Sequence, residues 1–130
     1  MGVRGKWFYD LFKSVGAGGS KEWFIHKQIS SASKNIKIEW LKAFFDDEAH
    51  VSKTKKRIVL NIVNKKGLIQ IQKLLDDLNI ESRIHGPYKY KQYKSYHLKI
   101  YGNSIRRYFS RIGFNEPNKQ KDLSELVTLI

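Results

Sequence analysis

The sequence predicts an α+β domain in which helices cover one face of a four-stranded antiparallel sheet and leave the other face open. Three observations predict it. Apolar and polar residues alternate in four short segments, which is the period of half-buried strands. The four segments form two pairs, each joined by a polar connection, so each pair is expected to be a hairpin. Segments with apolar residues at helical spacing stand before, between and after the hairpins.

The chain is expected to divide into a leader and one domain. Residues 6–15 carry apolar residues at helical spacing, and the glycines of 16–20 end this helix in a flexible loop. We therefore expect an N-terminal helix and linker over 1–35 and the α+β domain over 36–130. The loop lacks the spacing of a phosphate-binding loop and no strand precedes it, so it is interpreted as a linker.

The domain is expected to begin with a helix and a hairpin. The polar run 30–35 offers N-cap residues for a helix that continues to residue 48. The apolar positions of this helix are Ile36, Trp40, Leu41, Phe44 and Phe45. Alternation predicts strands over 49–53 and 57–63, joined through a turn that starts at Lys53.

The second half of the domain is expected to repeat this order. Residues 67–78 carry the apolar stripe of a helix that packs on a sheet and ends near Asn79. Strands are expected over 82–88 and 94–101, with a Lys- and Tyr-rich loop at 89–93. Two further helices are expected at 104–112 and 119–129. The predicted order is therefore αββαββα followed by a short final helix.

The composition indicates a polyanionic partner. The chain has 25 Lys and Arg against 12 Asp and Glu, a formal net charge of +13 and a pI of about 9.9. Such a field attracts nucleic acid or an anionic membrane surface. No apolar run approaches the roughly 18–20 residues of a membrane span and no signal peptide is visible, so we expect a soluble, intracellular, cytoplasmic protein. Because the chain has no Cys, disulfides, thiolate metal sites and a Cys nucleophile are excluded.

The open face of the predicted sheet carries mostly polar and basic side chains. Alternation places eight residues there: Arg57, Val59, Asn61, Arg83, His85, His97, Lys99 and Tyr101. Each of them alone could be an ordinary solvated strand residue. Together they include the side chains that reach base edges and phosphates, and a two-stranded ribbon fits the major groove. This face is therefore the predicted DNA-binding surface.

The first helix of the domain is predicted to end in three adjacent carboxylates, Asp46, Asp47 and Glu48. A helix C-terminus carries partial negative charge and prefers Lys or Arg, so this placement is unfavourable for stability. Because local rules are usually broken at functional sites, these acids are the predicted centre of the site. The four histidines lack the helical spacing of metal ligands, which argues against a zinc site: His26, His50, His85 and His97.

The segment Leu41-Lys-Ala-Phe-Phe-Asp-Asp-Glu-Ala49 resembles the LAGLIDADG motif, and the element order around it is similar to that of LAGLIDADG homing endonucleases and intein endonuclease domains. Further segments at 61–75, 96–102 and 111–119 are similar to characteristic stretches of that family in their expected order. The resemblance covers about 36–127. It implies a homing-endonuclease-like α+β fold, an association with introns or inteins, and Mg²⁺-dependent cleavage of double-stranded DNA.

The resemblance also implies roles for single residues. Glu48, at the eighth motif position, would hold the divalent cation, and the carbonyl of Asp47 would add a ligand, since hard oxygen ligands suit Mg²⁺. Lys119 fits the place of the family's active-site Lys best and Lys121 next, with a role in stabilising developing phosphate charge. Asp46 is expected to cap or brace the structure.

In the family, two motif helices pack side by side, which here implies an interface through Leu41, Ala43, Phe44 and Asp47. Two Asp47 side chains would approach each other in a symmetric pair, so a metal, other cations or a different partner surface would have to offset their repulsion. The leader resembles the end of a preceding repeat, without a first motif. We favour a homodimer, which matches a near-palindromic site, over a partner chain that supplies the first motif.

Two functions are compatible with these features. The first is a site-specific double-stranded DNA endonuclease that acts as a dimer by metal-dependent phosphodiester hydrolysis. The alternative is a catalytically inactive DNA- or RNA-binding module, such as a domesticated regulator or an intron-splicing cofactor. The acid at Glu48 and the cation at Lys119 favour the endonuclease.

Overall fold

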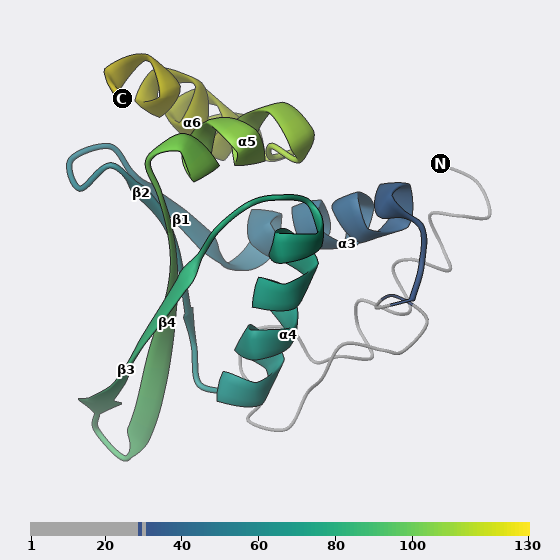
Figure 1. Cartoon of the computed structure of the whole chain (residues 1–130). Helices are drawn as coiled ribbons and strands as arrows, with labels where there is room; N and C mark the ends of the chain where they lie inside the picture. The colour runs from purple at the N-terminus through teal and green to yellow at the C-terminus, as the bar shows by residue number, and fades with distance from the viewer. Residues whose placement is uncertain (1–28, 30) are drawn as a thin grey trace.

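The computed structural model describes Ile29 and residues 31–130, so the helix expected at 6–15 and nearly all of the leader lie outside the described residues. The element order is α3 (Lys34–Glu48), β1 (Ala49–Ser52), β2 (Arg57–Ile62), α4 (Lys65–Asp77), β3 (Arg83–Tyr90), β4 (Tyr93–Tyr101), α5 (Asn103–Arg111) and α6 (Pro117–Leu129). The predicted α+β class is confirmed. Figure 1 shows α3 and α4 against one side of the sheet, with α5 and α6 stacked beyond its upper end.

The four strands form one antiparallel sheet in the order β1-β2-β4-β3. The two central strands therefore come from different hairpins. Their inward residues pair directly, Ile58 with Ile100 and Leu60 with Leu98, and all four side chains are fully buried. The alternation seen in the sequence is thus the alternation between a covered, apolar face and an open face.

The apolar stripe of α3 packs into the core of the domain itself. The side chains of Trp40, Leu41, Phe44 and Phe45 are all 0% exposed, and the Trp40 and Phe44 rings stack at 5.3 Å. Leu41 and Phe44 are therefore buried within the single chain, and their place in a helix-to-helix interface stays a prediction. Of the residues predicted for that interface, Ala43 is half-buried and Asp47 is exposed.

Two helices begin earlier than predicted because the capping residues precede the apolar stripe. α4 starts at Lys65, after Asn64, whose side-chain oxygen accepts a hydrogen bond from the Gly67 amide at 3.0 Å. α6 starts at Pro117, a residue suited to the first helical position because it has no N–H to satisfy. Neither of these helices is long and apolar enough to cross a membrane, and the same holds for every other helix among the described residues.

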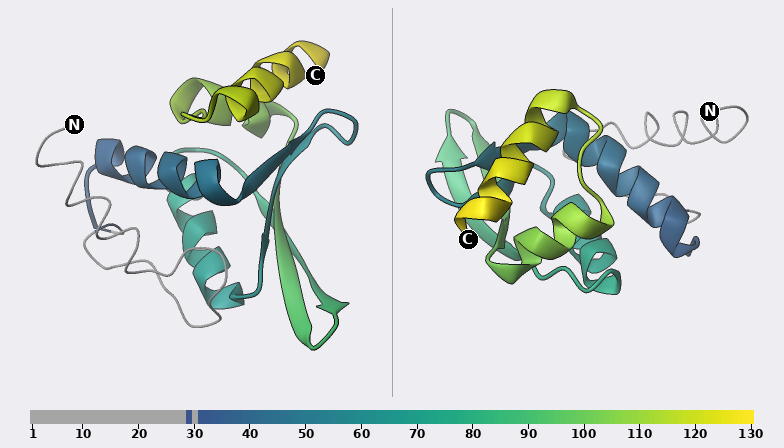
Figure 2. Two further views of the ribbon diagram at one scale, coloured as in Figure 1. Left: turned by 180° about the vertical axis from the view of Figure 1, so that it is seen from behind. Right: turned by 90° about the horizontal axis from the view of Figure 1, so that it is seen from above.

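The second hairpin is longer than predicted. Pairing continues through the expected loop, with two added pairs: Lys89 with Lys94, and Tyr90 with Tyr93. Only residues 91 and 92 connect the strands, and Lys91 takes a left-handed conformation at φ 56°. A register shift between His85 and Tyr88 interrupts the ladder. The hairpin therefore projects beyond the helices, as the lower end of the sheet in Figures 1 and 2 shows.

Candidate active site and nucleic-acid interface

The three carboxylates at the end of α3, Asp46, Asp47 and Glu48, form what we call the acidic cluster. The chain leaves the helix at Ala49 with φ −84°, an extended conformation, so this position does not require glycine. α3 has no basic residue in its last turn. Any cation that offsets the cluster and the negative end of the helix must therefore come from another element.

That cation is Lys119 of α6. Its ammonium group donates a hydrogen bond to the backbone carbonyl of Asp46 at 2.6 Å. The Asp46 side chain in turn accepts hydrogen bonds from the backbone amides of Asn115 and Glu116, at 2.8 and 3.1 Å. Asp46 thus holds the loop that leads into α6, as expected for a bracing residue, and Lys119 satisfies a terminal carbonyl of α3.

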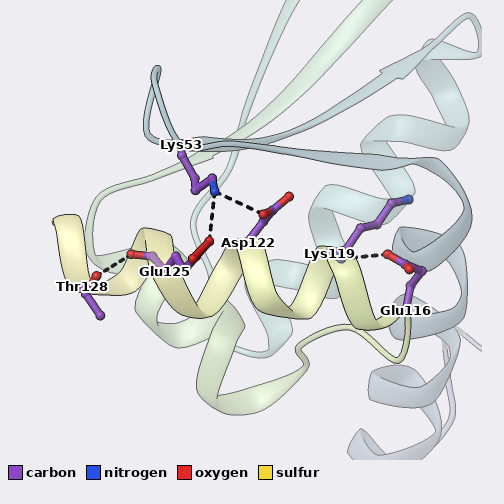
Figure 3. Close-up of polar contacts among 6 residues, drawn as sticks. All are labelled: Lys53, Glu116, Lys119, Asp122, Glu125 and Thr128. Atoms are coloured by element: carbon purple, nitrogen blue, oxygen red, sulfur yellow. Dashed lines mark hydrogen bonds and ion pairs between the residues drawn. The ribbon is translucent and has the colours of Figure 1, made fainter.

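Glu116 fixes the start of α6 and with it the backbone of Lys119. Its carboxylate accepts hydrogen bonds from the amides of Asn118 at 3.1 Å and Lys119 at 2.7 Å, which makes it the N-cap of the helix. Figure 3 shows the contact with Lys119. Glu116 was not among the residues predicted for the site, although an acid directly before a proline is a recognisable helix start. The loop before it is held by Gln120, whose side-chain oxygen accepts from the Phe114 amide at 2.7 Å.

Glu48 is the electrostatically strained member of the acidic cluster. Burial raises its pKa to about 7, helped by a hydrogen bond to the Asp47 side chain and by the charge of Asp47, while the charge of Lys119 acts in the opposite direction. The structure therefore brings together Asp47, Glu48 and Lys119. Lys121 is exposed and is not among the groups that shift the pKa of Glu48.

A second contact ties α6 to the first hairpin. Lys53, in the turn between β1 and β2, forms ion pairs with Asp122 at 3.3 Å and Glu125 at 2.9 Å, and both acids lie on α6 (Figure 3). The two acids raise the pKa of Lys53. All three side chains are well exposed, so this contact contributes little to stability.

The open face carries all eight residues that alternation places there. Three cross-strand rows run over it: Arg57 and Tyr101; Val59, Lys99 and Arg83; Asn61, His97 and His85. His50 of β1 pairs with Val59 and is exposed, so it extends the second row. Lys99 is only 9% exposed, so most of this residue is covered by its neighbours. A cavity of about 700 Å³ opens beside these rows at the start of β3, lined in part by Arg83, His85 and Lys99.

Three buried nitrogens on the open face have no hydrogen-bond partner. They are Nε of Arg57, Nε2 of His85 and Nδ1 of His97. A buried polar atom without a partner is unfavourable by roughly 1–3 kcal/mol unless a ligand or water satisfies it. The pKa of His97 is lowered by burial first, and then by the charges of Lys99, Arg57 and His85. The face is therefore cationic and incompletely satisfied.

The described part of the chain does not assemble a full set of metal ligands. Within Ile29 and residues 31–130, no group of three or more His, Cys, Asp or Glu side chains is arranged to hold a metal ion. The acidic cluster supplies two neighbouring carboxylates, those of Asp47 and Glu48, beside one cation.

The sequence of the chain matches the model of a known protein family. The model of the LAGLIDADG-like domain matches residues 35–113, more than half of the chain. The chain belongs to this family. Its fold is also similar to that of a solved structure of mesophilic variants of the homing endonuclease I-DmoI, with a TM-score of 0.53 and 22% identity. That match covers 66% of this chain and 46% of the other chain, so the described domain spans less than half of that protein.

A curated relative is the probable translation initiation factor IF-2 of Methanocaldococcus jannaschii. It is 28% identical over 99 residues, which is 74% of this chain but only 9% of the relative. The chain therefore corresponds to a small part of a much longer protein.

Proposed function

We propose that this chain is one half of a site-specific endonuclease that cleaves double-stranded DNA by metal-dependent hydrolysis. The observation that carries the proposal is the position of Glu48, half-buried beside Asp47 and Lys119, in a family whose fold is a nuclease fold. The cationic open face would hold the DNA backbone and read base edges, because its Arg, Lys, His and Asn side chains suit both tasks.

The donor set of the acidic cluster suits a divalent cation with oxygen ligands, such as Mg²⁺. Burial raises the pKa of Glu48 to about 7, and the hydrogen bond to Asp47 and the charge of Asp47 raise it further. A divalent cation held by Glu48, with Asp47 as a further ligand, would relieve this repulsion. When bound, the metal would activate water and stabilise the leaving oxygen, while Lys119 would stabilise charge that develops on the phosphate.

The proposal requires a second acidic cluster. One cluster offers two carboxylates, and the similarity to I-DmoI spans 46% of that chain, so a complete enzyme would need another unit of this kind. Ala43 and Asp47 are the residues of the predicted interface that reach the surface of α3. We favour a homodimer across this surface, with metal ions or DNA-side cations offsetting the approach of the two Asp47 side chains. A partner chain that carries another motif is the alternative.

The match to 9% of a translation initiation factor supports an origin inside a host protein. An endonuclease domain embedded as an intein would match in this way, because the rest of the host would have no counterpart here.

A DNA- or RNA-binding module without cleavage activity is the second candidate function. That candidate is favoured because no group of three or more His, Cys, Asp or Glu side chains among the described residues is arranged to hold a metal ion.

Replacing Glu48 by Gln tests the proposed function. A target is first selected from random duplex DNA by binding, and cleavage and binding are then measured separately with Mg²⁺ and with EDTA. The wild type should cleave only with Mg²⁺, and E48Q should cleave at least about 100-fold more slowly with unchanged binding. E125Q is the matched control, because it makes the same change on α6, away from the cluster, and should cleave like the wild type.

Unfolding does not explain a loss of cleavage in E48Q. Gln keeps the shape of the side chain and removes a charge that its surroundings disfavour, so the free energy of unfolding should be equal or higher. A wild type that binds its target with high affinity but does not cleave it with any divalent cation would instead establish the binding module.

A further inference from the structure

The end of the open face nearest the hairpin tip contains a cavity of about 480 Å³. We call it the hairpin pocket. Its lining includes Asn61, Tyr88, Lys89, Tyr93, Ser95 and His97. The Lys- and Tyr-rich segment was predicted to be a loop, but most of it is paired strand, so its residues have defined cross-strand neighbours. The pocket has a size typical of sites that receive a small planar group.

Two tyrosine rings dominate the exposed part of the hairpin pocket. Tyr88 is 41% exposed and Tyr93 is 49% exposed, so both rings offer apolar surface to a ligand. The Tyr88 ring is held against the His97 imidazole, with centroids 4.4 Å apart and planes inclined by 36°. Tyr88 is therefore an oriented platform, with room in the pocket for another flat ring.

The inner part of the hairpin pocket is polar. Nδ1 of His97 is buried and has no hydrogen-bond partner, and Asn61 pairs with His97 across the sheet. The Ser95 hydroxyl donates to the Tyr88 carbonyl at 3.5 Å, a long bond that leaves most of its capacity unused. A ligand that places a flat apolar face near the tyrosines and a polar edge toward His97 and Asn61 would fit these groups.

The other end of the open face has a different character. Arg57, Arg83 and Lys99 are charged groups suited to phosphates or to base edges within a stacked duplex. The hairpin pocket instead combines aromatic rings with neutral polar groups, and Lys89 is the cation of its lining. Aromatic rings with a polar edge are how proteins hold a base that has left the stack, while a neighbouring cationic surface holds its backbone.

We propose that the hairpin pocket binds one unstacked nucleobase of a DNA duplex whose neighbouring segment lies on the open face. The base would stack on Tyr93 or Tyr88 and direct its polar edge to His97 and Asn61. This inference rests on the proposed DNA-binding role of the open face. It goes beyond that role because a fully paired duplex offers no free base to such a pocket.

The test compares two duplexes of identical sequence, one fully paired and one with a single extra, unpaired 2-aminopurine nucleotide in one strand. The wild type should bind the duplex with the unpaired base about tenfold more tightly, because one base stacked on an aromatic side chain is worth roughly that factor or more. Stacking on tyrosine should also quench the 2-aminopurine fluorescence on binding.

Tyr93→Leu and Tyr88→Leu remove the rings and keep apolar side chains at exposed positions, so the fold should persist. Each should reduce the preference, and the double variant should abolish both the preference and the quenching. Tyr101→Leu is the matched control, because Tyr101 is similarly exposed at 39% but lies at the other end of the face. Tyr101→Leu should change the affinity for both duplexes by the same factor, so the ratio of the two affinities stays that of the wild type.

Three results would overturn the proposal. A wild type that binds both duplexes equally excludes a base-binding pocket, while salt-sensitive binding of the paired duplex would still support the proposed DNA-binding face. If the double tyrosine variant still prefers the duplex with the unpaired base, the preference comes from the flexibility of that duplex and not from the pocket. Failure to bind either duplex overturns both the pocket and the proposed function.

Discussion

The acidic cluster and the open face differ in how completely their polar groups are satisfied. At the cluster, Asp46 accepts two backbone amides and Lys119 donates to the end of α3. On the open face, buried nitrogens of Arg57, His85 and His97 have no partner. The first region is internally braced, whereas the second leaves buried polar atoms unsatisfied. This contrast matches the proposed division between residues that would position the chemistry and residues that would bind DNA.

The largest expected effect concerns the open face. If the face neutralises about five phosphates, raising the salt concentration from 50 to 200 mM should weaken DNA binding about 500-fold, because bound counterions are released. E48Q should show the same slope, because the acidic cluster contributes no cation. A measured slope near zero in a titration of binding against salt would contradict a phosphate-dominated interface and remove the contrast between the two regions.

The next effect concerns the bracing of the acidic cluster. Asp46→Ala removes the acceptor of the Asn115 and Glu116 amides and should lower the free energy of unfolding by about 2 kcal/mol. Cleavage should slow as well, because the loop that carries Lys119 loosens. Asp46→Asn retains a side-chain oxygen acceptor and should recover much of both losses. Urea unfolding that gives equal midpoints for wild type and Asp46→Ala would show that the bracing is unimportant.

A smaller effect is the pH dependence of binding. The pKa of His97 lies below its ordinary value of 6.5 in the free protein, and nearby phosphates would raise it in the complex. Binding would therefore take up a proton, and affinity should rise about threefold as the pH falls from 7.5 toward 5.5. His97→Gln should remove this part of the dependence. If the affinity of the wild type for DNA stays constant over this pH range, DNA binding is not linked to protonation of His97.

The same shift has the opposite sign for the stability of the free protein. Because the unfolded chain binds a proton at His97 more readily than the folded chain does, this residue contributes to a loss of stability as the pH falls through 6.5. Unfolding curves at pH 7.5 and 5.5, with His97→Gln as the reference, measure that contribution without DNA.

The smallest effect is expected at Lys53. Its ion pairs with Asp122 and Glu125 are exposed, so Lys53→Met should leave the urea midpoint and the cleavage rate within error of the wild type. A clear loss of cleavage would show that the tie between the first hairpin and α6 helps to position Lys119.

Most of the fold could be predicted because the alternation of residues such as Ile58, Val59 and Leu60 reports directly which side of a strand is covered. The surface against which the apolar stripe of α3 packs could not be predicted. The stripe that contains Leu41 and Phe44 indicates burial, but periodicity does not distinguish the sheet of the same chain from a partner helix, and the structure buries both in its own core. Long-range contacts such as that of Asp46 with Asn115 leave no periodic signal.

In the candidate site, too, the features that leave a local sequence pattern could be predicted and those that depend on long-range contacts could not. The acids at the end of α3 could be singled out because they violate a local electrostatic rule, and the open face followed from alternation. Glu116 was overlooked as a cap, and the hairpin pocket was hidden because the length of a hairpin depends on cross-strand pairing, which single segments do not encode.

The central claim is that each chain supplies one acidic cluster that cuts one strand. A supercoiled plasmid carrying the selected target, incubated with Mg²⁺ and wild type in the presence of a tenfold excess of E48Q subunits, tests it directly. Mixed dimers should accumulate nicked circles, whereas wild type alone should give linear product. Linear product that merely declines in proportion to the wild-type fraction, without a rise in nicked circles, would show that one chain cuts both strands and would contradict the account.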